Sequence, residues 1–205
     1  MHGGPTLGGA PGPGSGDVVA RCCATILGME IELRALTDDD LPKLSGGESA
    51  FDDFGPRGPR SEVPAPTLHE TGALAVCDAQ EKTLLGDVSW VWRQWGPTPE
   101  SRNPMIGIWL APGARGSGAG TQAQRALVDL FFRHTGVNRV EAGTDVDNVA
   151  EQRALEKAGF TREGTTRGAQ WRDGAYHDCH LYSMLRSEWE ASASRADGVS
   201  ANRWG

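Results

Sequence analysis

The stretch at residues 115–121 contains three alternating glycines and joins a short apolar run to a segment with helical periodicity. The apolar run, residues 105–110, has the composition of a buried strand. Alternating glycines let the main chain turn tightly with its N–H groups pointing inward, and the following helix adds unpaired N–H groups and the positive end of its dipole. Strand, glycine turn and helix in this order predict a cradle for a phosphorylated ligand, with Arg115 supplying a permanent charge at its rim.

Periodic patterns continue on both sides of this turn. Helical spacing predicts one helix after the glycines, ended by Gly136, and another that begins at Asn148 and ends at Gly159. The acidic run 37–40 has the form of a further helix start. Strands are predicted at 30–34, 74–77, 84–95, 105–110, 139–144, 163–172 and 175–185, the last two joined by the hairpin signal Asp173-Gly174. These elements predict one mixed sheet flanked by helices, an α/β fold of the α+β mixed type.

Composition limits the chain to one domain and to few kinds of partner. Because its first residues are mostly Gly, Pro and Ala, we expect a disordered extension at 1–28, a folded domain at 29–189 and a flexible tail at 190–205. The net charge of −7 disfavours a nucleic-acid partner, and no apolar run is long enough to span a bilayer. No secretory signal opens the sequence, so a cytoplasmic protein is expected. A monomer or homodimer is the expected oligomeric state.

Cysteine and histidine usage predicts no metal site. The segment His177-Asp178-Cys179-His180 has suitable residue types, but on a strand His177 and Cys179 face one way and His180 the other. No cysteine belongs to a C-x-x-C pair, which favours free thiols over a disulfide framework. The four cysteines are Cys22, Cys23, Cys77 and Cys179.

Two further features bear on a substrate. The segment 45–66 is rich in Gly, Pro and Asp, and a long loop of this kind inside a compact domain often belongs to a binding site. Trp90 and Trp92 share one face of the predicted strand 84–95. Packing against the core is the favoured interpretation of these two rings, and an aromatic platform for a substrate is the alternative.

Two familiar phosphate-binding motifs fit the glycine turn poorly. A P-loop requires a lysine directly after its glycines, and none stands there. A dinucleotide fingerprint matches at Gly118, Gly120 and Ala123, with Glu141 at about the expected distance. However, Glu141 lies near the start of its strand rather than the end, and the chain lacks the βαβ units of a doubly wound sheet.

A third pattern covers far more of the chain. Arg115-x-x-Gly118-x-Gly120 resembles the R/Q-x-x-G-x-G/A signature of the GNAT acyltransferase superfamily. The preceding strand, Asn148 with the later Glu156-Lys157-Ala158-Gly159-Phe160, and the segment 171–178 also resemble that family, in the right order. Together these motifs are most similar to the RimJ/RimL-type branch, whose best-known members acetylate the N-termini of ribosomal proteins.

The resemblance implies a single GNAT-like domain in which two neighbouring parallel strands splay apart around acetyl-CoA. The backbone of one splayed strand would pair with the pantetheine arm, the glycine turn would hold the pyrophosphate, and Asn148 would touch the pantetheine or cap its helix. The implied donor-binding residues are Ile108, Trp109, Leu110, Arg115, Gly116, Ser117, Gly118, Ala119, Gly120, Thr121 and Asn148.

The acid–base positions of the family carry other residues in this chain. Relatives often have a carboxylate at the position of Met105 and a tyrosine acid at that of Leu155. RimL-type enzymes use a serine and a glutamate at the positions of Glu151 and Gln170. All four positions are changed, which puts the RimL mechanism and its ribosomal substrate in doubt.

Three residues are therefore candidates for the acid–base chemistry. A two-residue turn at 173–174 would pair Gln170 with His177, and an imidazole is suited to proton transfer near neutral pH. A hydrogen-bonded strand histidine is the alternative interpretation. Glu151 is the second candidate, with a helix cap as its structural role, and Tyr182 is the third. Asp145 and a base acting through water stay open.

The predicted function is acetyl transfer from acetyl-CoA to a primary amine by a direct ternary-complex route. At pH 7 an α-amine costs only about 1.4 kcal/mol to deprotonate, against ~4–5 kcal/mol for a lysine, so a site with few acid–base groups favours an α-amine. Peptide N-termini and small amine metabolites both remain as acceptors. The alternative is a catalytically weakened GNAT-fold module that binds CoA as a sensor or interaction protein.

Overall fold

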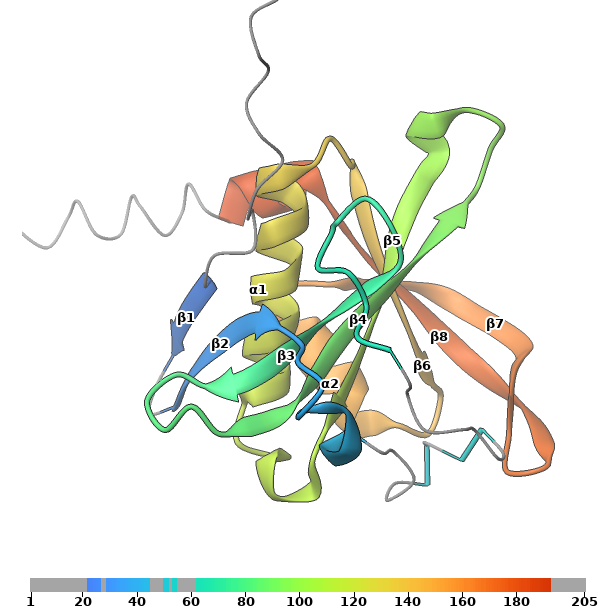
Figure 1. The fold of residues 1–205 in the computed structure, drawn as a ribbon. Helices are drawn as coiled ribbons and strands as arrows, with labels where there is room; N and C mark the ends of the chain where they lie inside the picture. The colour runs from blue at the N-terminus through green and yellow to red at the C-terminus, as the bar shows by residue number, and fades with distance from the viewer. Residues whose placement is uncertain (1–21, 27–28, 45–49, 52, 55–61, 193–205) are drawn as a thin grey trace, which may run out of the picture.

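A computed structural model describes residues 22–26, 29–44, 50–51, 53–54 and 62–192 (Figure 1). One eight-stranded sheet has the order β1-β2-β3-β4-β5-β6-β8-β7. Its strands are β1 (Cys22–Ile26), β2 (Met29–Ala35), β3 (Gly72–Asp78), β4 (Leu84–Gln94), β5 (Arg102–Leu110), β6 (Arg139–Asp145), β7 (Thr161–Arg172) and β8 (Ala175–Leu185). The helices are α1 (Ala119–His134) and α2 (Val149–Ala158), and three 3₁₀ turns are η1 (Leu41–Lys43), η2 (Pro99–Ser101) and η3 (Pro112–Ala114).

The sheet is antiparallel except between β5 and β6. These two strands pair in parallel only where Met105 meets Glu141 and Ile106 meets Ala142. Beyond Ile106, β5 continues along β4 as far as Leu110, so its other edge has no strand beside it there. This arrangement confirms the predicted fold, a mostly antiparallel sheet with one splayed parallel pair.

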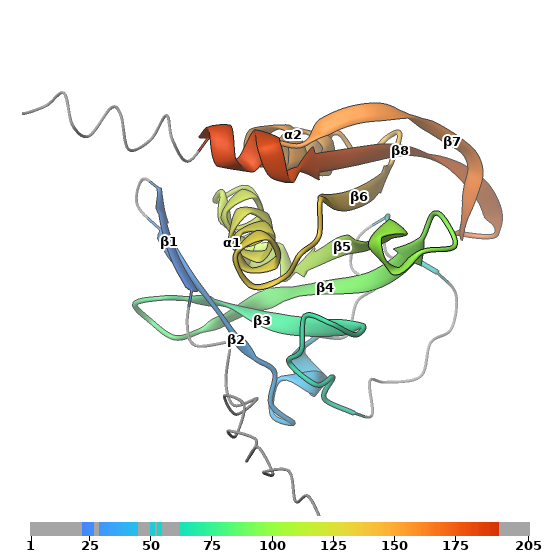
Figure 2. The same ribbon diagram turned by 90° about the horizontal axis from the view of Figure 1, so that it is seen from above.

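Helix α1 packs its apolar face into the bend of the sheet, as Figure 2 shows from above. Ala123, Leu127 and Phe131 of this face are fully buried, which follows from their helical spacing. Trp90 is 1% exposed and meets the Phe131 ring edge to face at 5.5 Å, and Trp92 does so at 6.0 Å. The packing interpretation of the two tryptophans is therefore confirmed.

Both ends of α2 follow the predicted capping pattern. The Asn148 side chain accepts a hydrogen bond from the Glu151 N–H at 3.2 Å, and Gly159 ends the helix with a φ of +104°. The Glu151 side chain does not complete a capping box, because its Oε1 accepts from Gln124 of α1 instead. The Glu151 side chain thus links α2 to α1.

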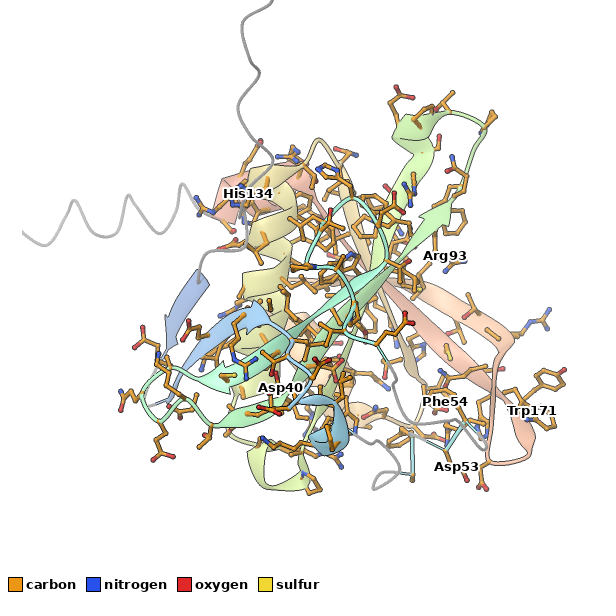
Figure 3. The ribbon with its side chains drawn as sticks, viewed as in Figure 1. Asp40, Asp53, Phe54, Arg93, His134 and Trp171 are labelled. Carbon is orange, nitrogen blue, oxygen red and sulfur yellow. The ribbon has the colours of Figure 1, made fainter. Side chains whose placement is uncertain are left out.

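The β7–β8 hairpin has the predicted register. Asp173 and Gly174 have φ angles of +48° and +71°, as a type I′ turn requires. The turn pairs Arg172 with Ala175 and Gln170 with His177. Figure 3 shows Trp171 near the turn end of this hairpin, with Asp53 and Phe54 beside it.

The N-terminal part differs from the sequence prediction in two ways. Cys22–Ile26, inside the segment expected to be disordered, forms β1 and pairs with β2. The acidic run 37–40 leads only to the 3₁₀ turn η1 rather than a full helix. Its Asp40 carboxylate accepts from both the N–H and the hydroxyl of Thr37 and pairs with Arg34 at 2.6 Å, so it stabilises a local turn.

The C-terminal part packs against the end of α1. Residues 186–192 are helical, and Arg186 donates to the carbonyl of Phe132 in the last turn of α1 and to those of Thr135 and Val137 just after it. The Trp189 indole N–H donates to Asp129 of α1. The predicted tail therefore begins inside this short helix, and residues 193–205 lie outside the described part. Within that part, no helix is long and apolar enough to cross a membrane.

Gly86 of β4 pairs with Leu110 of β5 at a point with no room for a side chain. A Cβ added there would lie 2.1 Å from the Trp109 carbonyl oxygen and 2.8 Å from Leu110 Cα, so the strands would have to separate. We expect Gly86→Ala to lower the free energy of unfolding by about 2–3 kcal/mol, measured by urea denaturation. Gly136→Ala, where a Cβ meets nothing within 4 Å, is the matched control and should change it by less than about 1 kcal/mol. Equal effects of the two substitutions would contradict this account.

Candidate functional site

The larger of two neighbouring cavities, about 440 Å³, lies between the free edge of β5, the glycine turn and the start of α2. Most of the residues predicted to bind the donor line it, whereas Ser117 and Ala119 do not. Those that line it are Ile108, Trp109, Leu110, Arg115, Gly116, Gly118, Gly120, Thr121 and Asn148.

The glycine turn is open toward this cavity. Gly116 and Gly118 have φ angles of +74° and +91°, which side chains rarely adopt, and a Cβ on either would meet nothing within 4 Å. Ser117 shapes the turn instead of lining the cavity: its hydroxyl donates to the Ala114 carbonyl at 2.8 Å and accepts from the Ala119 N–H at 3.4 Å. Because α1 begins at Ala119, the first N–H groups of the helix lie directly behind the turn.

Three cationic side chains line the larger cavity of this acidic protein. Arg115 donates from Nε to the Leu110 carbonyl at 2.9 Å and so stays beside the turn. Arg153 and Lys157, four residues apart on α2, also line the cavity. Sequence reasoning missed both, although the helical spacing of 150, 153, 154 and 157 on one face was a usable signal. The three charges favour an anionic ligand locally.

A smaller cavity of about 190 Å³ adjoins the first. Phe51, Ile108, Asn148 and Glu151 line both cavities, so they mark the junction. Beyond it, the smaller cavity lies between the diverging ends of β5 and β6. Its other lining residues are Phe54, Ile106, Gly107, Gln124, Ala142, Gly143, Thr144, Asp145, Leu155 and Gln170.

Glu151 is the titratable side chain at the junction. Burial raises the pKa of its carboxyl to about 7, while a hydrogen bond from Gln124 Nε2 at 2.5 Å acts in the opposite direction. A carboxyl with this pKa exchanges its proton near neutral pH. This is the property that a general base needs.

His177 lies outside the lining of both cavities. Its Nε2 donates to the Arg172 carbonyl at 3.0 Å, and its Nδ1 is 3.2 Å from Arg172 Nη2 and 3.5 Å from Asp145 Oδ2. Both ring nitrogens therefore have protein partners. The catalytic role predicted for His177 stays a prediction, and the contacts match its interpretation as a hydrogen-bonded strand histidine.

Tyr182 is fully buried and also lies outside both linings. Its hydroxyl donates to Glu156 Oε1 at 3.4 Å, and burial raises the pKa of the phenol. A raised pKa makes the phenol a weaker proton donor at neutral pH. Its role as a catalytic acid stays a prediction.

Arg172 and Asp145 form a buried ion pair beside the smaller cavity. Burial alone would raise the pKa of Asp145, but the Asp147 N–H and the Arg172 guanidinium outweigh it and lower the pKa. Arg172 also donates to the Ala50 carbonyl and lies over the Phe51 ring at 5.2 Å. The pair thus joins the end of β6 to the β7–β8 hairpin and to the segment that carries Phe51.

The predicted acceptor loop at 45–66 is described only in part. Phe51 and Phe54 line the smaller cavity, and the Asp53 carbonyl accepts from the Asp173 N–H at 2.8 Å (Figure 3). Residues 45–49, 52 and 55–61 lie outside the described chain. Trp90 and Trp92, considered as neighbours of an acceptor, line neither cavity.

Comparison with known families decides what kind of domain carries this site. A family model described as an acetyltransferase (GNAT) domain matches residues 30–161. The chain belongs to the GNAT acetyltransferase family. The motifs read from the sequence, from the glycine turn to the Gly159-Phe160 pair, therefore identified the family correctly.

Relatives support the same GNAT assignment. A putative ribosomal N-acetyltransferase of Bacillus subtilis, YdaF, is 36% identical over 44% of this chain and 49% of its own length. A ribosomal-protein-serine acetyltransferase of Escherichia coli is 29% identical over 58% of this chain and 64% of its own. Spermidine N-acetyltransferase from Vibrio cholerae, solved with CoA and spermine, has the same fold, with a TM-score of 0.60, 21% identity and coverage of 78% and 97%. The chain spans about half to two thirds of the length of the two sequence relatives.

Three of the four altered GNAT acid–base positions meet at the smaller cavity. Glu151, Leu155 and Gln170 all line it, whereas Met105 does not. Glu151 stands at the position where RimL-type enzymes have a serine, and it is the titratable member of the three. Glu151 is therefore the candidate acid–base residue among these altered positions.

The raised pKa of Glu151 predicts a pH-dependent contribution to folding. Since its pKa is about 7 in the folded state and 4.5 in model compounds, the native state holds this proton more tightly. The contribution of the Glu151 proton to the free energy of unfolding is thus fully present below pH 4.5, and it is lost as pH rises through 7. We expect Glu151→Gln to remove this loss, so urea unfolding should show the variant gaining stability relative to wild type between pH 5 and pH 8. A constant difference between the two proteins over that range would contradict the shift.

Proposed function

We propose that this chain is an acetyl-CoA-dependent N-acetyltransferase that acts through a direct ternary complex. Acetyl-CoA would occupy the larger cavity and a primary amine the smaller one. The observation that carries the proposal is the junction of the two cavities at Glu151, whose pKa of about 7 suits proton transfer. An amine and a thioester held on either side of this junction would meet beside a base.

The residues of the larger cavity fit the chemical parts of CoA. The free edge of β5 at Ile108 and Leu110 offers backbone groups to the amides of the pantetheine arm. The glycine turn and the start of α1 offer N–H groups to the pyrophosphate. Arg115, Arg153 and Lys157 would balance the phosphate charges.

Glu151 would act as the general base. Its carboxylate would accept a proton from the bound ammonium, which leaves a neutral amine. The amine nitrogen would then form a bond to the thioester carbonyl carbon, and the C–S bond would break. The second proton would leave the nitrogen, and the departing CoA thiolate would take up a proton, which yields the amide and free CoA.

The smaller cavity favours an amine without a neighbouring carboxylate over a zwitterion such as a free amino acid. Asp145 and Glu151 line it, and among the described residues that line it there is no Lys, Arg or His to bind a carboxylate. A base with a pKa of about 7 also matches an α-amine of pKa near 8 better than a lysine. Peptide N-termini and small amines of similar pKa both fit this description, as does the ribosomal substrate in the name of the relative YdaF, whereas the alkylamines of spermidine are like that of lysine.

Gly118 tests the donor half of the proposal. Its φ of +91° and its open Cβ direction mean that a side chain would strain the turn and intrude into the larger cavity. We expect Gly118→Val to weaken acetyl-CoA binding at least ~100-fold by calorimetry, equivalent to losing one or two charge-assisted hydrogen bonds. Gly113→Val in η3, outside the cavity lining, is the matched control and should bind like wild type. An unchanged affinity in a folded Gly118→Val protein would refute the loop assignment.

Glu151 tests the acceptor half. With a panel of α-amines, lysine side chains and polyamines, wild type should release CoA from acetyl-CoA fastest on an α-amine. Glu151→Gln should lower kcat by about 10²–10⁴-fold, the usual range for removing a general base, while acetyl-CoA still binds. The measurement is thiol release between pH 6 and pH 9.

Three outcomes would count against this assignment. Donor binding without turnover on any amine would favour the alternative, a CoA-binding GNAT module without transferase activity. Faster turnover on lysine side chains would refute the α-amine preference. If the midpoint in the pH profile of thiol release disappears in His177→Ala but persists in Glu151→Gln, the general base is His177 instead of Glu151. The cytoplasmic location and the oligomeric state stay predictions.

A further inference from the structure

Gln124 is a buried polar side chain of α1, a helix whose other buried residues are mostly apolar. It is 1% exposed and lines the smaller cavity. Its amide Nε2 donates to Glu151 Oε1 at 2.5 Å, while its Oε1 is buried without a hydrogen-bond partner among the described residues. An unpaired buried amide oxygen destabilises a fold, and a leucine at this position would avoid that cost.

The two ends of this amide have complementary chemistry. The N–H end fixes one carboxylate oxygen of Glu151 at the junction of the cavities. The oxygen end has no hydrogen-bond partner among the described residues, and the side chain that carries it lines a cavity that, on the proposed function, receives an ammonium group. An ammonium has three donors, so it can bond both to the carboxylate and to a neutral amide oxygen beside it.

We propose that Gln124 is a positioning residue of the acetyl transfer, which orients the Glu151 carboxylate through its amide N–H and receives the acceptor's ammonium on its amide oxygen. The inference rests on the proposed function, because it names how the acceptor cavity recognises an amine. It also explains why an amide stands here rather than a carboxylate or an apolar residue. A carboxylate would repel Glu151, and an apolar residue would leave that carboxylate without its donor.

Other charged groups near Glu151 leave Gln124 as the relevant neighbour. Asp145 of β6 is already paired with Arg172. The hydroxyl of Tyr182 on β8 donates to Glu156 rather than to Glu151. The other charged side chains that line the larger cavity together with Glu151 are Arg115, Arg153 and Lys157.

The test replaces Gln124 by leucine and by methionine and compares both with Gln122→Leu. Gln122 is 4% exposed on the same helix but lines neither cavity, so it controls for removing a buried amide. Two readouts are needed: the Glu151 titration by carboxyl-carbon NMR, assigned with Glu151→Gln, and the pH profile of steady-state kinetics with the best amine of the panel.

Both Gln124 variants should raise the Glu151 midpoint by about one pH unit, because the ionised carboxylate loses its donor. The KM for the amine should rise about tenfold, the equivalent of one hydrogen bond to a charged group, while the KM for acetyl-CoA stays within about twofold. Gln122→Leu should leave the Glu151 midpoint, the KM for the amine and the KM for acetyl-CoA unchanged. If the leucine variant does not fold, the methionine variant, which has the length of glutamine, decides.

An NMR midpoint that is unchanged in both Gln124 variants would overturn the inference, as would equal effects of Gln122→Leu. The NMR titration separates this failure from a failure of the proposed function. Should wild type turn over no amine, the proposed function fails, and the Glu151 midpoint alone then decides whether Gln124 controls that carboxylate.

Discussion

The early divergence of β5 from β6 is the constraint on which the rest of the site depends. After two parallel residue pairs the strands part, and β5 continues along β4 with one edge unpaired. A sheet interior is normally closed by its own hydrogen bonds, so a gap of this kind must be filled by side chains or by a ligand. Here the gap holds both cavities. The glycine turn, α1 and α2 are placed around it because each follows directly from one of the two diverging strands.

Positive and negative side chains are distributed unequally between the two cavities around the same gap. The chain as a whole carries a net charge of −7, yet the larger cavity is lined by Arg115, Arg153 and Lys157. The smaller cavity carries carboxylates and amides. An anionic donor and a cationic acceptor would therefore be attracted to different sides of one junction. Glu151 stands where the two environments meet, and the burial that raises its pKa follows from this central place.

The local geometry of the proposed donor half of the site was predictable from the sequence, and the side-chain contacts of the proposed acceptor half were not. Local patterns determine the glycine turn, the Asn148 cap and the Asp173-Gly174 hairpin, because backbone geometry at these points requires particular residue types. The pairing of Gln170 with His177 also followed from turn length alone. What His177 and Tyr182 contact depends on tertiary neighbours such as Arg172 and Glu156, which no local pattern reveals. The hydrogen bond from Gln124 to Glu151 joins two helices and was equally hidden, as was the strand at Cys22–Ile26 within a segment of low-complexity composition.

One wall of the smaller cavity, the proposed acceptor cavity, is attached to the β7–β8 hairpin through its backbone. The segment carrying Phe51 and Phe54 is held by two of its own backbone carbonyls, that of Ala50 bound by Arg172 and that of Asp53 bound by the Asp173 N–H. Backbone attachment does not depend on which side chains the segment carries. Exchange of its aromatic residues would therefore leave these two backbone hydrogen bonds in place, although loss of the Phe51 ring would remove its contact with Arg172. Point substitutions at Phe54, which lines only the smaller cavity, could then change the proposed acceptor preference while the larger cavity stays as it is.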